Sequence, residues 1–388
     1  MLTIIGSGMS PSKISCIKDK LANFDAVVCD KSYELDTNHT NIKPFGFKDA
    51  QNYILQNYLE KNIAYIVSGS PFFYSGATNI IKFAKEIGVQ IEFKNAKSSK
   101  DYVIEKLFIA ENELSFTSWH GRENIDLKEL FNKKYTLILC DEFTPKRLHE
   151  EIKFLREEAY KITVCSRLGY EDENFYQANI AEICDNIPKV PFVLLLEKNF
   201  TNKAAISSDD ELLYERGMFT KEYKRHLILQ LLELKPNMAL WDIGAGSGSI
   251  SVDAHKTYKI KSILFEKDEN RCKYIVQNLQ NHNILGAKLH IGSALENIQN
   301  ETTNPDRIFM GGGGTELIQN LESVLNRLKP NGIFVAAIVS LANLSQIINK
   351  LDALNIVYDV KALSLTTYKT KLQISEPERQ IFLLKVIK

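Results

Sequence analysis

Short apolar runs alternate with longer amphipathic segments over most of the chain. In the first half the apolar runs predict strands. The segments between several of them, such as Lys48–Glu60 and Pro145–Glu158, carry apolar residues at every third or fourth position, which is the helical spacing. The predicted strands are Leu2–Ile5, Ala26–Cys29, Ile63–Ser68, Val89–Phe93, Leu114–Trp119, Tyr135–Cys140, Lys161–Ser166 and Val190–Leu196. This alternation predicts βα units, with sheets of parallel character flanked by helices.

The alternation stops at Asn199–Asp210, where the residues are small or polar and show no period. This segment follows a predicted strand and precedes a predicted helix, which is the usual place of a domain linker. We therefore expect two α/β domains, residues 1–203 and residues 204–388, that are not copies of each other.

After the linker the alternation resumes. Helices are predicted near Lys221–Leu234, from Ser249, at Glu269–Asn281 and at Glu316–Leu328. Strands are predicted at Ala239–Ile243, Ile263–Glu266, Lys288–Ile291, Arg307–Met310 and Ile333–Val339. The last two apolar runs, Val357–Leu365 and Gln380–Val386, predict an antiparallel end to the second sheet.

Composition excludes several classes of protein. Of the 388 residues, 44% are hydrophobic and 25% charged, as in ordinary globular proteins, and 48 Lys and Arg residues balance 48 Asp and Glu residues. A neutral chain does not coat nucleic acid or an anionic membrane through bulk charge, so we expect neither partner. There is no run of about 20 apolar residues and no signal-peptide pattern, which predicts a cytoplasmic protein.

Six cysteines, at positions 16, 29, 140, 165, 184 and 272, are scattered without a C-x-x-C pair. This spacing is typical neither of a disulfide framework nor of a zinc ribbon, so it predicts a reducing compartment and mostly buried thiols. Because no cluster of Cys and His ligands is present either, we expect no metal site.

The strongest local motif is a glycine-rich turn in the second half, Trp241-Asp-Ile-Gly-Ala-Gly-Ser-Gly-Ser-Ile250. It joins a predicted strand, ending near Asp242, to a predicted helix. A dinucleotide fingerprint would need a glycine where Ser249 stands, a phosphate-binding P-loop would need G-K-[ST], and a tight turn without a ligand is a further alternative. Lacking a Cβ, glycines let a ligand approach main-chain N–H groups, and three of them alternate here: Gly244, Gly246 and Gly248.

The G-x-G-x-G spacing after an acidic residue at the strand end resembles the class I S-adenosylmethionine (SAM) methyltransferases. Glu266 closes the next predicted strand, about twenty residues on, where an acidic side chain can accept hydrogen bonds from both ribose hydroxyls. By this resemblance Asp242 borders the methionine part of SAM, and Gly292-Ser293-Ala294 borders the adenine. Ser293 stands where such families often have an acidic residue.

The loop after the fourth predicted strand of this domain bears on which molecule accepts the methyl group. The run Asp306-Arg-Ile-Phe-Met-Gly-Gly-Gly-Gly-Thr315 lacks the N-P-P-Y or D-P-P-Y motif that amino-methylases of nucleic acids carry. Its glycines, Gly311 among them, leave a wide bare stretch of backbone. That stretch is either a flexible loop or a surface against which a large flat acceptor lies.

This loop, the glycine turn and the segment Arg216-Gly-Met-Phe-Thr-Lys221 together resemble the C15-methylating, C12-decarboxylating precorrin methyltransferases of cobalamin biosynthesis. In that family the R-G-x-x-T-K segment folds over the SAM site. The resemblance therefore implies site roles for Arg216, Thr220 and Lys221, and it makes Arg216 a candidate catalytic residue. As an alternative or in addition, Thr220 would be an ordinary helix N-cap.

The first half carries its own series of motifs, which begins with a G-x-G after the first predicted strand. In this order they resemble the tetrapyrrole (class III) methyltransferases, specifically the C5-methylating precorrin subfamily, over about residues 1–200. That fold has two α/β subdomains with SAM in the cleft between them. The motifs are Ile4-Ile-Gly-Ser-Gly-Met-Ser-Pro11, Ile66-Val-Ser-Gly-Ser-Pro-Phe-Phe-Tyr-Ser-Gly76, Ser98-Ser99, Ser118-Trp-His-Gly-Arg122 and Ser166-Arg-Leu-Gly-Tyr-Glu-Asp-Glu173.

The resemblance implies that the glycine and serine residues of two of these motifs line the cofactor and substrate cleft: Gly6, Gly8, Ser68, Gly69 and Ser70. Ser70 stands where the family usually has an aspartate. The H-G-R match implies a cleft role for Arg122, whose guanidinium suits a carboxylate. His120 is either an acid or base or a structural hydrogen-bonding residue.

Taken as a whole, the chain resembles the family of fused precorrin-6Y C5,15-methyltransferases (decarboxylating). The resemblance implies one SAM per domain, a small-molecule precorrin tetrapyrrole as substrate, and a homo-oligomer. Because such a substrate carries many carboxylates, local basic clusters are expected at Arg216–Arg225 and at Arg122. Two alternatives stay open: an RNA methyltransferase with an accessory domain, and a catalytically inactive SAM-binding scaffold.

Overall fold

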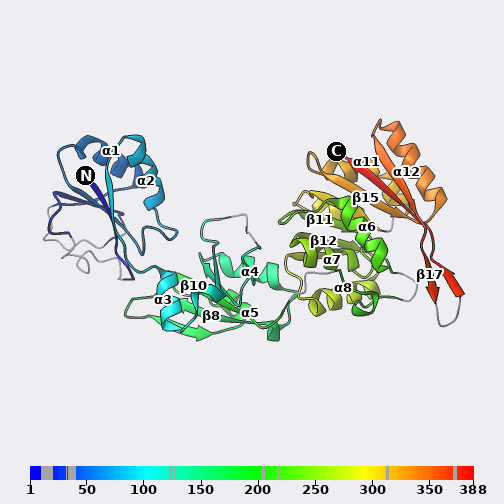
Figure 1. Cartoon of the computed structure of the whole chain (residues 1–388), viewed down its shortest axis with the longest axis horizontal. Coiled ribbons are helices and arrows are strands. Elements are labelled where there is room, and N and C mark those ends of the chain that lie inside the picture. The colour runs from blue at the N-terminus through cyan, green and yellow to red at the C-terminus, as the bar shows by residue number, and fades with distance from the viewer. Residues whose placement is uncertain are drawn as a thin grey trace. The chain divides into compact units, whose positions relative to one another are not determined.

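The computed structural model describes residues 1–9, 21–31, 33, 41–122, 125, 127–201, 206–215, 219–311, 314–369 and 374–388. It separates into two compact units (Figure 1). Unit 1 comprises Met1–Ile125, Glu129–Pro145 and Lys161–Lys198, and unit 2 comprises Asp126–Lys128, Lys146–Tyr160 and Asn199–Lys388. The domain boundary expected at residue 203 remains a prediction.

Unit 1 begins with a parallel five-stranded sheet in the order β3-β2-β4-β1-β5. Continuous apolar runs form its inner strands, and every residue of β1 is buried, as expected for a parallel sheet covered on both faces. The strands are β1 (Leu2–Gly6), β2 (Ala26–Cys29), β3 (Ile42–Pro44), β4 (Ile63–Val67) and β5 (Ile91–Lys94), and the helices are α1 (Phe47–Asn57) and α2 (Ala77–Glu86).

The second sheet of unit 1 has the order β6-β7-β10-β8-β9 and mixes parallel and antiparallel pairs. Two of the strands in unit 1, β3 and β9, were not expected from the sequence, because each is short and has no apolar run of its own. Pairing with β2 and with β8 defines them. The elements are β6 (Leu114–Ser118), β7 (Tyr135–Leu139), β8 (Tyr160–Ser166), β9 (Asn174–Gln177), β10 (Phe192–Lys198), α3 (Ser99–Lys106) and α5 (Ile180–Asp185). Helix α4 (Thr144–Ile152) follows β7 in the chain, but most of it belongs to unit 2.

Unit 2 is built on a seven-stranded sheet in the order β13-β12-β11-β14-β15-β19-β16. All neighbours are parallel except β19, which runs antiparallel to both β15 and β16, so the predicted antiparallel end of the sheet is confirmed. The strands are β11 (Ala239–Ile243), β12 (Lys261–Glu266), β13 (Ala287–Ile291), β14 (Arg307–Met310), β15 (Ile333–Ile338), β16 (Tyr358–Leu363) and β19 (Ile381–Ile387). The α/β class predicted for both halves is confirmed.

Helices flank this sheet and complete two hydrophobic clusters, one containing Trp241 and Phe334 and the other containing Leu240 and Val335. The single helix predicted at Glu316–Leu328 is divided at Asn320 into two. The helices are α6 (Glu222–Leu232), α7 (Ser249–Tyr258), α8 (Glu269–Asn281), α9 (Ala294–Asn300), α10 (Thr315–Gln319), α11 (Leu321–Arg327) and α12 (Leu341–Ala353).

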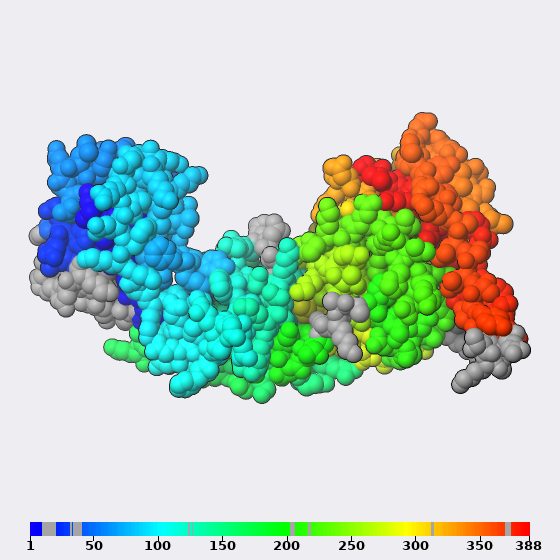
Figure 2. All heavy atoms as spheres, viewed as in Figure 1, coloured from blue at the N-terminus to red at the C-terminus, as the bar shows by residue number. Residues whose placement is uncertain are grey.

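A two-stranded hairpin, β17 (Thr366–Lys369) and β18 (Ile374–Pro377), stands out from the body of unit 2 (Figures 1 and 2). It is inserted between the last two strands of the seven-stranded sheet. The hairpin was not predicted from the sequence, because its residues are mostly polar.

Buried thiols were expected, and four of the cysteines in the described ranges are buried: Cys29, Cys140, Cys165 and Cys272. Burial raises the pKa of the Cys165 thiol to about 12, so this group stays protonated at neutral pH. Within the described ranges, no helix is both long enough and apolar enough to cross a membrane.

Candidate cofactor and substrate sites

The glycine turn of unit 2 lies between β11 and α7. Its three glycines adopt the left-handed backbone, with φ of 69° at Gly244, 60° at Gly246 and 74° at Gly248, which explains the choice of residue. A Cβ added at Gly246 would meet nothing within 4 Å, so the space beside this residue is open. The Gly246 N–H donates to Oε2 of Glu266 over 2.8 Å, which joins the turn to the end of β12.

Glu266 is 4% exposed and accepts a second hydrogen bond, from the Asp268 N–H to its Oε1 over 3.0 Å. Its own carbonyl accepts from the Gly292 N–H, which places the turn after β13 beside it. Ser293 follows as the N-cap position of α9, and its side chain makes no capping hydrogen bond. The backbone of Gly292-Ser293-Ala294 therefore lies next to the acid expected to bind ribose.

Asp242 is 1% exposed and sits one residue before the end of β11. Its Oδ2 accepts from the Ser251 hydroxyl over 2.8 Å, whereas its Oδ1 finds no partner among the residues that the structure describes. Burial raises the pKa of Asp242 to about 7, and the charge of Glu266 adds to the effect. A buried acid with a vacant acceptor atom is a strong candidate for ligand contact.

The Gly311 N–H donates to the Ile243 carbonyl over 3.0 Å, so the loop after β14 begins beside the glycine turn. The structure thus brings most of the residues predicted for the second domain to the carboxyl ends of four adjacent parallel strands, where ligands of open α/β sheets bind. These residues are Asp242, Gly244, Gly246, Gly248, Glu266, Ser293, Ala294 and Gly311.

The segment before α6, which we call the strap, comprises the described residues 206–215 and 219–221. Asn278, fully buried in α8, holds it beside the glycine turn: the Asn278 side chain donates to the carbonyls of Leu213 and Ser247 and accepts from the Leu213 N–H. The rings of Tyr214 and Phe219 stack 4.0 Å apart. Arg216, predicted from the family motif, lies outside the described residues.

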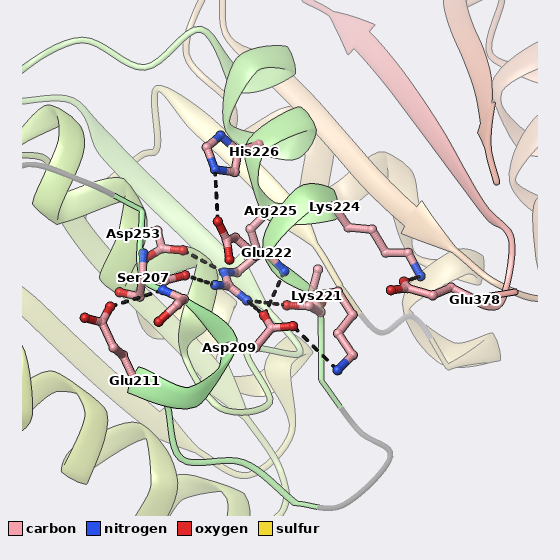
Figure 3. A network of polar contacts seen from close by, with 12 residues as sticks. Ser207, Asp209, Glu211, Lys221, Glu222, Lys224, Arg225, His226, Asp253 and Glu378 are labelled. Carbon is pink, nitrogen blue, oxygen red and sulfur yellow. Dashed lines mark hydrogen bonds and ion pairs between the residues drawn. The ribbon is translucent and has the colours of Figure 1, made fainter. Parts of the chain in front are cut away.

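Arg225 fastens both ends of the strap (Figure 3). It is fully buried, and its Nε donates to Oδ2 of Asp253, likewise buried, over 2.6 Å. Its Nη1 donates to Asp209 over 3.0 Å and to the Thr220 carbonyl over 2.7 Å, and its Nη2 donates to the Ser207 carbonyl. All three nitrogen atoms of this guanidinium therefore donate hydrogen bonds within the protein.

Two sequence expectations about this region are corrected. Arg225 does not offer charge to a substrate, because buried acceptors engage it, and Lys224 is also largely buried with its Nζ 2.9 Å from Glu378. Ser207, near the end of the predicted linker, is fully buried. Thr220 does not cap α6, because Lys221 occupies the N-cap position, and the Lys221 Nζ pairs with Asp209 at 3.5 Å.

In unit 1 the two glycine motifs meet at the carboxyl ends of β1 and β4. Gly8 and Gly69 form an antiparallel bridge, with N–H to carbonyl distances of 3.2 and 3.3 Å, and both have positive φ. A Cβ at Gly6 would lie 2.5 Å from the Gly69 carbonyl oxygen, so this position requires glycine. Ser68 is exposed, while Ser70 is buried and donates to the Asn95 side chain over 2.8 Å.

His120 and Arg122 follow β6 and are both exposed. The Nδ1 of His120 lies 3.1 Å from the Cys140 carbonyl oxygen. Because a carbonyl oxygen can only accept a hydrogen bond, Nδ1 is the donor in this contact. The Arg122 guanidinium lies 5.6 Å from the ring centre of Tyr74, in the loop that begins at Ser68. Arg122 therefore lies beside the loop that begins at Ser68, and its role in a substrate cleft stays a prediction.

Sequence reasoning missed the exposed Asn95, which bonds to Ser70, and four buried polar residues that hold the site of unit 2 together: Asn278, Arg225, Asp253 and Ser251. The only signal in the sequence was a polar residue at a core-facing position of a predicted helix, which does not reveal its partners. In the described part of the chain, no group of His, Cys, Asp and Glu is arranged to hold a metal ion.

Comparison with known proteins matches two family models to successive parts of the chain. Residues 2–184 match the model for tetrapyrrole (corrin/porphyrin) methylases, and residues 211–356 match the model for a precorrin methyltransferase domain. The two matches cover the two glycine turns described above.

Individual proteins are also similar to this chain. A precorrin-6Y C(5,15)-methyltransferase [decarboxylating] of Sinorhizobium sp is 27% identical over 289 residues, or 72% of this chain and 68% of the relative. A protein of Methanobrevibacter smithii named "Probable cobalt-precorrin-6B C(15)-methyltransferase (decarboxylating)" is 32% identical over 35% of this chain and 72% of its own length. The crystal structure of a precorrin-6Y C5,15-methyltransferase from Geobacter metallireducens is 25% identical, with a TM-score of 0.45, over 48% of this chain and 98% of that one.

Proposed function

Because the chain belongs to the precorrin-6Y C5,15-methyltransferase (decarboxylating) family, we propose that it methylates a precorrin macrocycle at C5 and at C15 and removes CO₂ from the acetate side chain at C12. Unit 1 carries the C5 reaction, and unit 2 carries the C15 reaction with decarboxylation. The strongest support is the succession of two different methylase models along one chain.

SAM is the methyl donor that the methyltransferase relatives imply, and the residues of unit 2 suit it. The open space at Gly246 admits a ligand to the backbone, Glu266 has acceptor capacity left for ribose hydroxyls, and the vacant Oδ1 of Asp242 can accept from an amino group. When bound, SAM supplies an electrophilic methyl group on a sulfonium. The protein then has to orient the acceptor carbon and exclude water.

The fit in unit 1 rests on fewer groups. Gly69 leaves open space beside its Cα, and the Gly8–Gly69 bridge holds two glycine turns together at one sheet edge. Ser70, at the position of the family aspartate, is already paired with Asn95, so it contributes no carboxylate. We propose that this turn holds a second SAM, which makes one per unit.

The mass of the product tests the proposed reaction. Purified full-length protein is incubated with SAM and the hydrogenated precorrin substrate, and the product is analysed by mass spectrometry. We expect a gain of two methyl groups and a loss of one CO₂. A gain of a single methyl group, or no change, would contradict the proposal.

Binding stoichiometry tests the two SAM sites separately from activity. Calorimetric titration of the full chain with SAM should give two sites in the wild type. Gly8→Arg and Gly246→Arg should each leave one, because each substitution places a long side chain at one turn only. A single site in the wild type would contradict one SAM per unit.

A further inference from the structure

One face of helix α8 contacts both the glycine turn of unit 2 and the strap. Arg271, Ile275 and Asn278 are spaced four and three positions apart, so they lie on the same side of the helix. Ile275 packs against the turn, since a Cβ added at Gly248 would meet its Cγ2 at 3.4 Å. Arg271 pairs with Glu215 of the strap over 2.9 Å. This helix face therefore connects two segments that are separate in the sequence.

Asn278 joins the two segments directly through hydrogen bonds. Its side-chain nitrogen donates to the Ser247 carbonyl over 2.9 Å and to the Leu213 carbonyl over 2.8 Å, and its Oδ1 accepts from the Leu213 N–H over 2.8 Å. Both donor hydrogens and the acceptor oxygen of this amide are thus used. Asn278 and Ser247 are both buried, so loss of the side chain would take this partner from the Ser247 carbonyl where water is excluded.

Apolar packing alone would not fix the strap relative to the turn. Leu212 and Phe219 of the strap and Ala245 of the turn belong to one hydrophobic cluster, but such packing has no directional preference. The Leu213 side chain is 42% exposed, so its backbone is held mainly by the amide of Asn278. The orientation of the turn at Ser247 is therefore tied to the position of the strap.

We propose that Asn278 is a positioning residue for SAM binding in unit 2, because it fixes the glycine turn to the strap through Ser247 and Leu213. The affinity for SAM then depends on the strap, and by thermodynamic linkage bound SAM stabilises the strap by the same factor. This inference rests on the proposed function, since it concerns the SAM site of unit 2. It gives a role to a residue outside the glycine motif that need not touch the ligand.

Calorimetric titration with SAM tests the effect on affinity. It is carried out in the Gly8→Arg background, so that the site of unit 2 is measured. Asn278→Ala should raise the Kd for SAM about tenfold, because the turn loses a buried hydrogen bond that holds it in place. Asn300→Ala is the matched control, since the Asn300 amide donates to the Glu296 carbonyl of its own helix, α9. The control should leave the Kd within about twofold.

Hydrogen exchange measured by mass spectrometry tests the coupling in wild-type protein, so it does not depend on how well a variant folds. Saturating SAM should slow exchange of the strap segment 206–215, which contains the Leu213 N–H, by at least about fivefold. In Asn278→Ala the glycine turn should still respond to SAM, whereas the strap should no longer respond.

The outcomes separate this inference from the proposed function. If SAM slows exchange at the glycine turn of wild-type protein and leaves the strap unchanged, the inference is overturned and the proposed function stands. The same holds if Asn278→Ala keeps the wild-type Kd, or if it exchanges faster throughout unit 2 while its strap still responds to SAM, as a purely structural role would predict. If neither the turn nor the strap of wild-type protein responds to SAM, the proposed site of unit 2 and the inference both fail.

Discussion

The two glycine turns of this protein occupy similar places, each at the carboxyl end of a parallel strand, yet their glycines serve different purposes. At Gly246 in unit 2 an added Cβ would meet nothing within 4 Å, whereas at Gly6 in unit 1 it would lie 2.5 Å from a backbone carbonyl. The first glycine leaves room for a ligand. The second allows two loops to approach, which then form the Gly8–Gly69 bridge.

The two turns also differ in how far along the sequence the residue that bonds to each of them lies. In unit 2 the completing acid, Glu266, ends the strand next to the turn, so one local stretch of sequence contains most of the site. In unit 1 the partner of Gly8 comes from a segment far along the chain, which only the pairing of β1 with β4 brings close. A local motif is therefore sufficient evidence for the first kind of site and weak evidence for the second.

The largest expected effect comes from filling the open turn. Gly246→Arg should reduce C15 methylation and CO₂ release by at least about 100-fold, because the side chain occupies the ligand space and the residue keeps a strained positive φ. C5 methylation, measured by product mass, should stay within about twofold of wild type.

Gly88→Arg is the matched control for this variant. Gly88 also has a positive φ, of 71°, and open space around it, but it lies between α2 and β5 away from either turn. It should leave both methylations unchanged. Equal loss of C5 and C15 methylation in Gly246→Arg would contradict independent sites.

Removing the buried arginine behind the strap should cost unit 2 much of its stability. Arg225→Met leaves the buried carboxylate of Asp253 without its positively charged partner, and the expected loss in the free energy of unfolding is about 3–5 kcal/mol. Denaturant unfolding, followed with a probe in unit 2, measures it. The same substitution at Arg271, whose pair with Glu215 is partly exposed, should cost less than about 1 kcal/mol. Equal costs would mean that Arg225 does not hold the strap.

The smallest possible side chain should distinguish the packed turn from the open one. Gly6→Ala forces the Gly69 loop away and should lower C5 methylation about tenfold, with a loss of about 1–3 kcal/mol in stability. Gly246→Ala meets no atom and bears only the strain of its positive φ, of about 1 kcal/mol. The kcat/KM of each methylation measures both effects. If Gly6→Ala reduces C5 methylation and Gly246→Ala reduces C15 methylation to the same extent, the two turns do not differ in packing as described.

The last prediction concerns the pH dependence of SAM binding at the turn of unit 2. The folded pKa of Asp242 is raised from its ordinary value of 3.8 to about 7, so the neutral acid is favoured in the fold and its contribution to stability is lost as pH rises through this window. A bound ligand amino group favours the carboxylate instead. SAM affinity should therefore fall about tenfold per pH unit below about pH 7.

Calorimetric titration of the Gly8→Arg variant with SAM measures binding at the site of unit 2 alone, because the substitution blocks the site of unit 1. Asp242→Asn in the same background should bind SAM more weakly at neutral pH and lose the pH dependence between about pH 5 and pH 7. An unchanged slope in Asp242→Asn would assign the titration to another group.

Prediction from sequence was most accurate where structure is local. Strands β11 and β14 and helix α8 begin and end at the predicted residues, because their apolar periods and turn residues lie within each segment. It was least accurate where pairing creates the element, as in β3, β9 and the β17–β18 hairpin. Family membership was recognised from motif order, which does not depend on knowing any contact.

The sequence by itself determined the α/β class, the order of the strands along the chain, and a site at the end of β11, since strand, glycines and Glu266 follow one another closely. Only the tertiary structure decided that Arg225 is buried while Arg122 is exposed, and that Phe73 and Phe116 meet. The sequence specifies the type and charge of each residue, but the burial and partners of a side chain depend on which distant segments the sheets bring beside it.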